Sequence, residues 1–207
     1  MSLLGLIMLM TSVSLLFAQR TPGPALSQTS PDFLPVLGQI SDFELTASTN
    51  RPFHSEQMAG KIWVADFIFT SCAGICPIMS SAMSNLQHSF QSDDRVHFVS
   101  ISVDPETDTA EVLSKYGERF GANPLRWHFL TGDIEFIHPL ATGTFKIGSL
   151  DDPLIHSSRF VLIDGAGQIR GYYIGTDTED VATLAEDIAE LLVELSAIQR
   201  VQNAGRQ

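Results

Sequence analysis

Basic residues are scarce in this chain of 207 residues, in which 12 Lys and Arg stand against 24 Asp and Glu, for a formal net charge of -12. Nucleic-acid binding depends on clustered Lys and Arg that release counterions from phosphates, so the composition excludes nucleic acid as a partner. With 44% hydrophobic residues the chain has apolar material for one ordinary core, and it is too short for two typical domains. We therefore expect one globular domain.

The chain also has no apolar run of full membrane-spanning length. The uncharged run from Leu3 to Ala18 is shorter than the roughly 20 residues that usually cross a bilayer. No basic residue precedes it, and Leu16 stands where a cleavage site would carry a small residue, so a cleaved signal, an uncleaved membrane anchor and a buried helix all stay open. Signal and anchor, the leading interpretations, both place the domain outside the cytoplasm, where thiols tend to oxidise.

Composition divides the chain into four parts. We assign a signal or membrane-anchor segment (1–19), a flexible linker rich in Pro, Ser and Thr (20–38), a domain (39–200) and a C-terminal tail (201–207).

Apolar patterning predicts strands and helices in alternation. Strands are expected at 43–48, 61–69, 96–103, 127–132, 159–164 and 168–175, the last two as a hairpin around the turn GAG. Helices are expected at 77–90, 108–121, 133–144 with an interruption at Pro139, and 178–200. The last helix carries an apolar stripe that we interpret as core: Val181, Leu184, Ile188, Leu191, Leu192, Leu195 and Ile198. The order predicts an α/β sandwich with a mixed sheet and helices on both faces.

Cysteine is limited to Cys72 and Cys76, both in the stretch TSCAGICPIMS. Pro77 is expected at the first helical position, which would put Cys76 near the N-cap and Cys72 in the preceding loop. Free N–H groups and the positive end of the dipole at a helix N-terminus favour thiolate over thiol. We therefore expect two activated sulfurs at one helix end.

Three roles for this thiol pair stay open. A structural disulfide that closes so short a loop would contribute roughly 2 kcal/mol, on which a domain of this size does not depend. Structural zinc usually takes four Cys and His ligands, and the chain offers two thiols and scattered histidines. Thiolates select Cu(I), and an added imidazole suits either copper oxidation state, so copper binding is the leading hypothesis and reversible redox chemistry the second.

A third copper ligand has to come from the six histidines. Five of them we interpret as ordinary surface or core residues: His54, His88, His97, His128 and His138. His156 differs, because it lies in a loop that enters the strand expected at 159–164, and such a loop can face a neighbouring strand-to-helix loop.

The segments FTSCAGICP, SVDPETDT, LTG and HSSRFVLIDGAG occur in this order, and with them the chain resembles the Sco/SenC family of copper-binding proteins from about Phe43 to the final helix. The resemblance implies a thioredoxin-like fold, here with an N-terminal β-hairpin extension, and copper bound by Cys72, Cys76 and His156. It also implies an extracytoplasmic domain that faces the periplasm or an equivalent space and is tethered to the inner membrane.

Family members deliver copper to the binuclear copper site of cytochrome c oxidase or reduce the cysteines of that site. The expected partners are therefore the copper-site subunit of the oxidase or another copper acceptor, a thioredoxin-like reductant, and the membrane through the N-terminal segment. Ala73 stands where many members have proline, which bears on the rigidity of the loop and not on ligation.

Acidic residues are expected close to the ligands. Asp104 and Asp108 match the acidic positions of the family motif DPxxDT; we expect Asp108 or Thr109 to cap a helix and Asp104 to lie beside the ligands. Asp66 precedes Cys72 by six residues, the offset of the buried acid of thioredoxins. By that analogy it would lie beneath the thiols with a raised pKa; the alternative is a hydrated carboxylate at a strand edge.

Two main functions follow. As a metallochaperone, the chain would hold copper through both thiols and His156. As a thiol–disulfide oxidoreductase, Cys72 would attack a partner disulfide and Cys76 would resolve the mixed species, without any need for the histidine. A thiol peroxidase or a copper-sensing protein is a weaker third hypothesis, since one fold supports many functions.

Overall fold

The computed structural model describes residues 34–148 and 157–205. Eight strands form one sheet in the order β1-β8-β7-β4-β5-β6-β2-β3. The strands are β1 (Gly38–Gln39), β2 (Glu44–Ala47), β3 (Pro52–His54), β4 (Ile62–Ile68), β5 (Val96–Ser102), β6 (Trp127–Thr131), β7 (Arg159–Ile163) and β8 (Gln168–Ile174). The helices are α1 (Ile75–Ser89), α2 (Ala110–Arg119), α3 (Ile134–Pro139) and α4 (Thr178–Ala204), with a 3-10 turn at Ser55–Met58 and a π-helical turn at Leu140–Thr144.

The sheet is mixed, as predicted. Strands β4, β5 and β6 are parallel, and β7 and β8 add to them as an antiparallel hairpin on the side of β4. The β2–β3 hairpin pairs with the far side of β6, which confirms the N-terminal hairpin extension.

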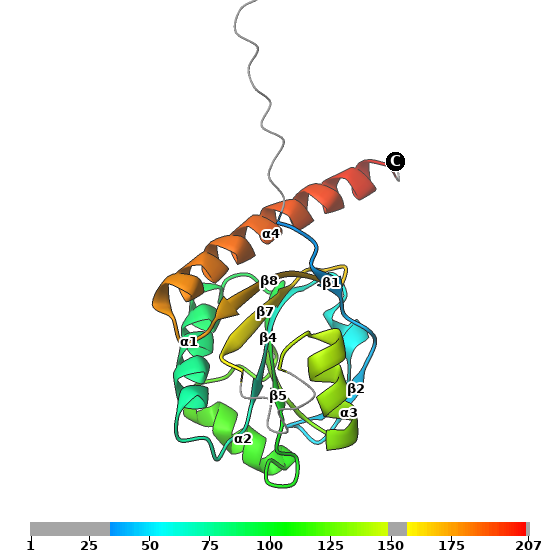
Figure 1. Ribbon diagram of the computed structural model, residues 1–207. Coiled ribbons are helices and arrows are strands. Elements are labelled where there is room, and N and C mark those ends of the chain that lie inside the picture. Colours follow the sequence, from blue (N-terminus) through cyan, green and yellow to red (C-terminus); the bar gives the residue numbers. More distant parts are fainter. Residues whose placement is uncertain (1–33, 149–156, 206–207) are drawn as a thin grey trace, which may run out of the picture. The chain divides into compact units, whose positions relative to one another are not determined.

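Helices cover both faces of the sheet (Figure 1). Alternation along β4 divides its side chains between two clusters: Trp63, Ala65 and Phe67 join one, and Ile62, Val64 and Ile68 join the other. The first cluster packs under α3 and the β2–β3 hairpin, and the second packs under α1, α2 and α4. The predicted α/β sandwich is therefore confirmed.

Helix ends differ from the prediction in one place that bears on the thiols. Helix α1 begins at Ile75, so Pro77 is its third residue and not its first. The first N–H groups of a helix have no intrahelical acceptor, so proline is tolerated anywhere in this turn.

At α2, the Thr109 side chain accepts a hydrogen bond from the N–H of Val112, so Thr109 and not Asp108 is the cap. Pro139 ends α3, and a π-helical turn continues it.

The apolar stripe of α4 is core along most of its length. Leu184, Ile188 and Leu191 are buried against the sheet, whereas Ile198, near the C-terminal end, is 46% exposed. The interpretation of the stripe as core is therefore correct for the first turns and wrong for the last, where the helix has passed the strands that it covers.

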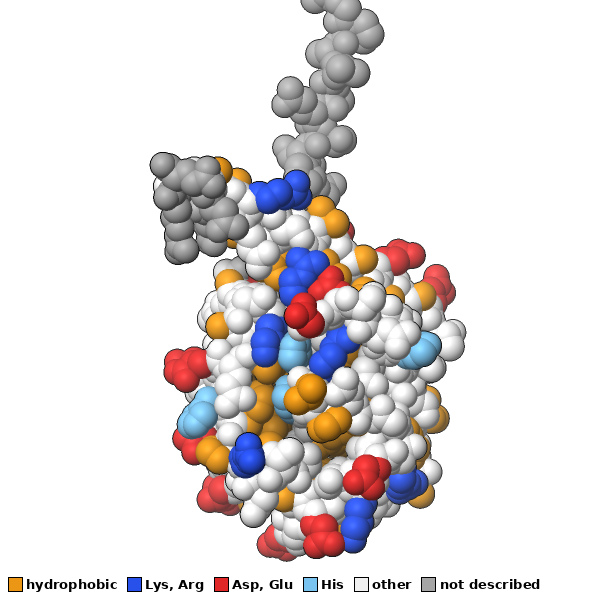
Figure 2. Space-filling model, turned by 180° about the vertical axis from the view of Figure 1, so that it is seen from behind, with side chains coloured by type: hydrophobic (Ala, Val, Ile, Leu, Met, Phe, Trp, Pro, Cys, Tyr) orange, Lys and Arg blue, Asp and Glu red, His pale blue; other side chains and the backbone are white. Residues whose placement is uncertain are grey.

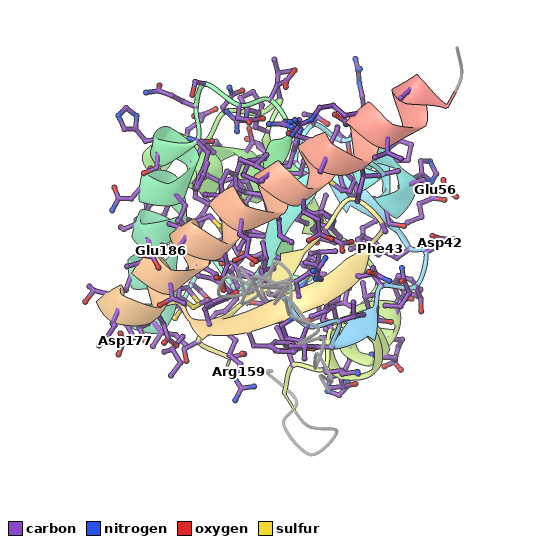
Figure 3. The ribbon with its side chains drawn as sticks, turned by 90° about the horizontal axis from the view of Figure 1, so that it is seen from above. Asp42, Phe43, Glu56, Arg159, Asp177 and Glu186 are labelled. Carbon is purple, nitrogen blue, oxygen red and sulfur yellow. The ribbon has the colours of Figure 1, made fainter. Side chains whose placement is uncertain are left out.

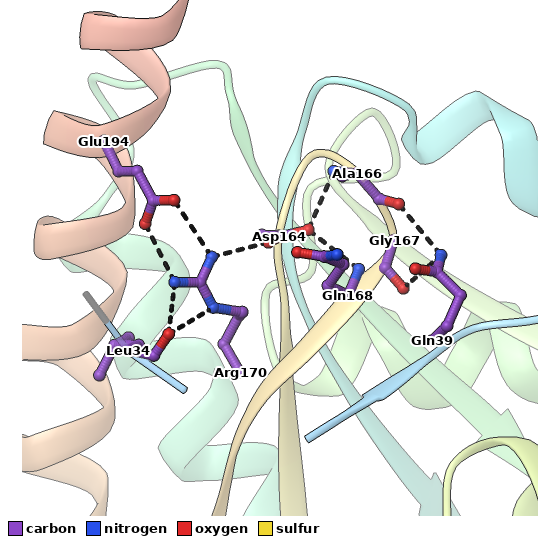
Figure 4. A network of polar contacts seen from close by, with 8 residues as sticks. All are labelled: Leu34, Gln39, Asp164, Ala166, Gly167, Gln168, Arg170 and Glu194. Atoms are coloured by element: carbon purple, nitrogen blue, oxygen red, sulfur yellow. Dashed lines mark hydrogen bonds and ion pairs between the residues drawn. The ribbon is translucent and has the colours of Figure 1, made fainter. Parts of the chain in front are cut away.

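A buried ion-pair network fixes the start of the described chain to the domain (Figure 4). Arg170 of β8 is 4% exposed and pairs with Asp164 at 2.8 Å and with Glu194 of α4 at 3.1 Å. Its guanidinium also donates to the carbonyl oxygen of Leu34 at 2.6 and 3.0 Å. One side chain thus joins the incoming chain, the β7–β8 turn and α4.

On the face of the domain seen in Figure 2, charged side chains of both signs surround an area of exposed hydrophobic and histidine side chains. Within residues 34–148 and 157–205, no helix has the length and apolar character needed to cross a bilayer. The expected anchor segment, 1–19, lies outside the described residues.

Candidate metal and thiol site

The two cysteines lie where β4 passes into α1. Strand β4 is central, its side chains are buried, and it ends at Ile68, from which a short uncharged loop leads to α1. The N–H of Cys72 donates to the carbonyl of Phe69 at 3.2 Å, which folds the loop back on itself. Cys72 is half-buried in this loop, and Cys76 is 2% exposed in the first turn of α1; both are free thiols.

The two thiols differ in acidity. Burial opposes ionisation of Cys72, but backbone N–H groups of residues 74–76 and the Cys76 side chain outweigh it, so the pKa of the Cys72 thiol is lowered. Burial raises the pKa of Cys76 to about 12, and the nearby Cys72 and Asp66 add to this rise. The helix end therefore activates Cys72, the more accessible of the two cysteines, and leaves Cys76 as a thiol.

Asp66 lies in the middle of β4 and is fully buried. Strands β5 and β7 flank β4, so the strand-edge alternative is excluded. By alternation Asp66 shares the face of Val64 and Ile68, which belong to the same cluster as Cys76. Burial raises the pKa of Asp66 to about 7, and the neighbouring Ser100 hydroxyl offsets this only in part. Among the described residues, no side chain makes a hydrogen bond of normal geometry to either carboxylate oxygen.

Tyr116 is a residue near the thiols that sequence patterning did not single out. Its hydroxyl lies 2.9 Å from that of Ser80, which is in α1 one turn after Cys76. Burial raises the pKa of Tyr116 to about 12, and the charges of Asp66 and Cys76 contribute. The only sequence signal for this placement is its position on the apolar face of the helix expected at 108–121.

Asp108 has a different role from the one predicted for it. Its carboxylate is fully buried and accepts hydrogen bonds from the Thr70 N–H at 3.0 Å, from the Thr70 hydroxyl, and from the Ser102 hydroxyl at 2.6 Å. Thr70 precedes Cys72 by two residues. Asp108 therefore fixes the start of the cysteine loop to the loop between β5 and α2.

Asp104 lies in that same β5–α2 loop, partly exposed, and organises it through its backbone. Its carbonyl accepts from the N–H groups of Thr107 and Asp108 at 3.1 and 2.8 Å. His156 lies outside the described residues, so its predicted ligation stays a prediction. Within residues 34–148 and 157–205, no three His, Cys, Asp or Glu side chains gather closely enough to hold a metal ion.

Two other histidines lie side by side: His97, which is buried, and His128, which is half-buried. The rings of His97 and His128 stack with centroids 5.8 Å apart and planes 5° apart, and the Phe53 ring lies against His128. Burial lowers the pKa of each to about 4, so both are neutral at physiological pH. Their interpretation as ordinary surface or core residues agrees with this packing.

The parallel β4–β5–β6 core, the hairpin beside it and a thiol pair where β4 enters α1 define a thioredoxin-like protein. The chain belongs to the SCO1/SenC family, whose model matches residues 37–193.

Individual relatives agree with this assignment. An SCO1 homologue of Bacillus subtilis is 30% identical over 160 residues, which cover 74% of this chain and 83% of the relative. An SCO2-like protein of Rickettsia typhi is 32% identical over 192 residues, with 82% and 91% covered. Among solved structures, a SCO1/SenC family lipoprotein from Bacillus anthracis superimposes with a TM-score of 0.70 at 31% identity, covering 77% of this chain and 99% of that one. Yeast Sco1 with copper bound matches at 23% identity with a TM-score of 0.61, over 76% and 93%, which supports the fold alone.

Proposed function

We propose that this protein is a copper carrier in which Cys72, Cys76 and His156 hold the ion before it passes to an acceptor protein. The observation that carries the proposal is the thiol pair of a SCO1/SenC family member, placed at one helix end, with Cys72 half-buried and activated and Cys76 buried. Two sulfur donors fit a soft ion such as Cu(I), and an imidazole would allow Cu(II) as well.

The position of the strands supports His156 as the third ligand. Strand β7 begins at Arg159 and runs antiparallel to β4, pairing Val161 with Ala65. The segment just before β7 and the loop just after β4 therefore belong to the same end of two neighbouring strands. His156 precedes β7 by three residues, and Cys72 follows β4 by four.

Names of related structures point to the acceptor and to the location. The solved structure of BsSco, at 29% identity and TM-score 0.68, is that of a member of the Sco family of cytochrome c oxidase assembly proteins, and the Bacillus anthracis neighbour is a lipoprotein. By similarity, the acceptor here is a copper site of cytochrome c oxidase. The domain would work outside the cytoplasm, held at the membrane through residues 1–19.

Metal titration tests the ligand set. The reduced full chain, titrated with Cu(I) and Cu(II), should bind one equivalent, and His156→Ala should lose at least about tenfold in affinity, because losing even a residue that only orients a ligand costs about 10–100-fold. The matched control is His88→Ala, which removes an exposed imidazole at the far end of α1. Copper affinity unchanged in His156→Ala would remove that residue from the site.

Thiol–disulfide exchange is a second candidate, favoured by the difference in acidity between the two thiols. The Cys72 thiolate would attack a partner disulfide and form a mixed disulfide, releasing one partner thiolate. Cys76, after losing its proton, would then attack the Cys72 sulfur, release the second partner thiolate and leave an intramolecular disulfide. A measured reduction potential and turnover with a disulfide substrate distinguish this activity from copper carriage, because exchange does not need His156.

A further inference from the structure

The surface that continues from Cys72 along α1 carries no charge. Residues 67–92 contain no Lys, Arg, Asp or Glu, in a chain that is 17% charged overall. This is not a consequence of burial, because the loop residues Ser71, Ala73 and Gly74 are exposed. An exposed stripe then follows α1 at helical spacing through Ile78, Ser81, Asn85 and His88. We name these seven residues the α1 face.

The large apolar side chain of the α1 face is Ile78, which is 55% exposed and lies two residues after Cys76. Depletion of charge with an apolar anchor at the centre is the compositional signature of protein–protein interfaces, whereas a solvated helix face normally carries Lys and Glu. Since the exposed residues Ser71, Ala73 and Gly74 flank Cys72, a protein that exchanges a ligand with Cys72 has to cover the start of the α1 face.

The helix beside the α1 face supplies the charge that such a partner would meet. Helix α4 packs over the same face of the sheet as α1. The N-terminal half of α4, which follows Asp177 and contains Glu186, lies next to α1 (Figure 3). Exposed acids on this half are Glu179, Glu186 and Glu190, and residues 171–199 contain no Lys or Arg.

We propose that the α1 face is the docking surface for the partner of Cys72, and that this partner presents an apolar, uncharged patch around its own sulfur or copper ligands, with Lys or Arg where α4 lies. This rests on the proposed function and adds to it the chemistry of the acceptor surface. Opposite charge along α4 would steer the encounter, and the uncharged centre would set how long the complex lasts.

Mixed-disulfide formation with defined peptides tests the surface directly. In the full chain carrying Cys76→Ser, Cys72 is the sole thiol. The probes are twelve-residue peptides with one cysteine activated as a thiopyridine disulfide, flanked either by Leu and Lys, by Ser and Lys, or by Leu and Glu. The Cys72 thiolate attacks the peptide sulfur, a disulfide to Cys72 forms, and thiopyridine leaves with the electron pair. Dithiodipyridine, which is small and uncharged, reports the reactivity of Cys72 alone.

The Leu and Lys peptide should react about tenfold faster than either other peptide, a difference of about 1.4 kcal/mol. Ile78→Asp should make the Leu and Lys peptide react no faster than the Ser and Lys peptide, while the rate with dithiodipyridine stays unchanged. Ser81→Glu, one turn further along α1, should have the same effect. The double variant Glu186→Lys, Glu190→Lys should make the Leu and Lys peptide react no faster than the Leu and Glu peptide. Val201→Asp, at a residue 74% exposed near the far end of α4, is the control and should change nothing.

The proposal is overturned if Ile78→Asp and Ser81→Glu leave the peptide rates unchanged, if they slow dithiodipyridine equally, or if Val201→Asp acts as they do. Cu(I) titration of Ile78→Asp with both cysteines intact distinguishes a failure of the docking surface from a failure of the copper-carrier function. A chain that binds copper but shows no peptide selectivity loses only the docking surface. A selective chain that binds no copper loses only the copper-carrier function.

Discussion

The Asp108 carboxylate accepts a hydrogen bond from the backbone N–H of Thr70 at 3.0 Å, across 38 positions of sequence. Thr70 starts the loop that carries Cys72, and Asp108 ends the loop that leads into α2. Since the same carboxylate also holds the Ser102 hydroxyl at the end of β5, it fixes the cysteine loop to the sheet. The position of Cys72 therefore depends on a residue outside the cysteine motif.

Asp108→Asn should weaken copper binding and destabilise the domain. The amide would place an NH₂ group where one oxygen now accepts from Thr70 or Ser102, so at least one buried donor loses its acceptor. Hydrogen bonds to a charged group contribute about 1.5–3 kcal/mol each, and we expect a loss of unfolding free energy of about 2 kcal/mol. Urea unfolding measures this loss, and Cu(I) titration should show weaker binding at temperatures where the variant is fully folded.

The matched control for Asp108→Asn is Glu106→Gln, which removes a carboxylate from an exposed position of the same loop. It should change neither stability nor copper affinity. If Asp108→Asn lost stability while the copper affinity and the Cys72 thiol pKa of the folded variant stayed at parent values, the carboxylate would be a purely structural group.

The choice between Asp108 and Thr109 as the cap of α2 shows where sequence reasoning stopped. A DPxxDT motif before a helix offers two capping side chains, and the pattern alone could not separate Asp108 from Thr109. Thr109 made the cap because Asp108 is turned inward to Thr70, a contact set by the parallel pairing of β4 with β5. Such a long-range contact leaves no local signal.

Strands and helices were predictable because their apolar periods are strong. The continuous apolar run at 61–69 became β4, buried on both faces between β5 and β7, and the spacing in 178–200 became α4. The start of α1 was missed by two residues because proline fits any position of a first turn and does not mark its beginning. Burial of Asp66 could be predicted only by analogy, since a lone acid in an apolar strand is compatible with an edge as well.

Asp66→Asn should lower the pKa of the Cys76 thiol. The ionised carboxylate raises that pKa by like-charge repulsion, and an amide of nearly the same shape removes the charge. The measurement is the pH dependence of alkylation of Cys76, made in Cys72→Ser so that a single thiol reacts. An alkylation pKa identical with and without Asp66 would mean that this buried acid does not tune the thiols.

Acid should destabilise the domain through His97 and His128. The pKa of each is lowered by burial from 6.5 to about 4 in the folded chain, so the unfolded chain takes up protons first as the pH falls. Their contribution is complete above about pH 6.5 and is lost between pH 6.5 and 4, by at most about 3 kcal/mol for each histidine. Urea unfolding at a series of pH values should show a shallower acid loss in His128→Phe, which keeps an aromatic ring against Phe53.

Asp66 acts in the opposite direction over nearly the same pH range. Its folded pKa of about 7 lies above the ordinary 3.8, so its contribution is present at low pH and is lost as the pH rises through about 7. Asp66→Asn should therefore make the acid loss steeper than in the parent, and His128→Phe should make it shallower. Equal slopes in the two variants would contradict both assignments.

Arg170 should be the most sensitive charged residue for stability. Arg170→Met would leave Asp164 and Glu194 without their cation and the Leu34 carbonyl without its donor. Removing one partner of a buried ion pair typically costs about 3–5 kcal/mol, because the remaining charge stays desolvated. Arg170→Lys keeps the charge, but lysine has no planar fork with which to reach three acceptors, so its loss of unfolding free energy should be intermediate.

A double-mutant cycle of Arg170→Met with Glu194→Gln, measured by urea unfolding, isolates the contribution of the Arg170–Glu194 pair. A coupling energy near zero would show that Glu194 is too well hydrated to matter. Arg200→Met, an exposed arginine two turns further along α4, is the control and should leave the unfolding free energy unchanged.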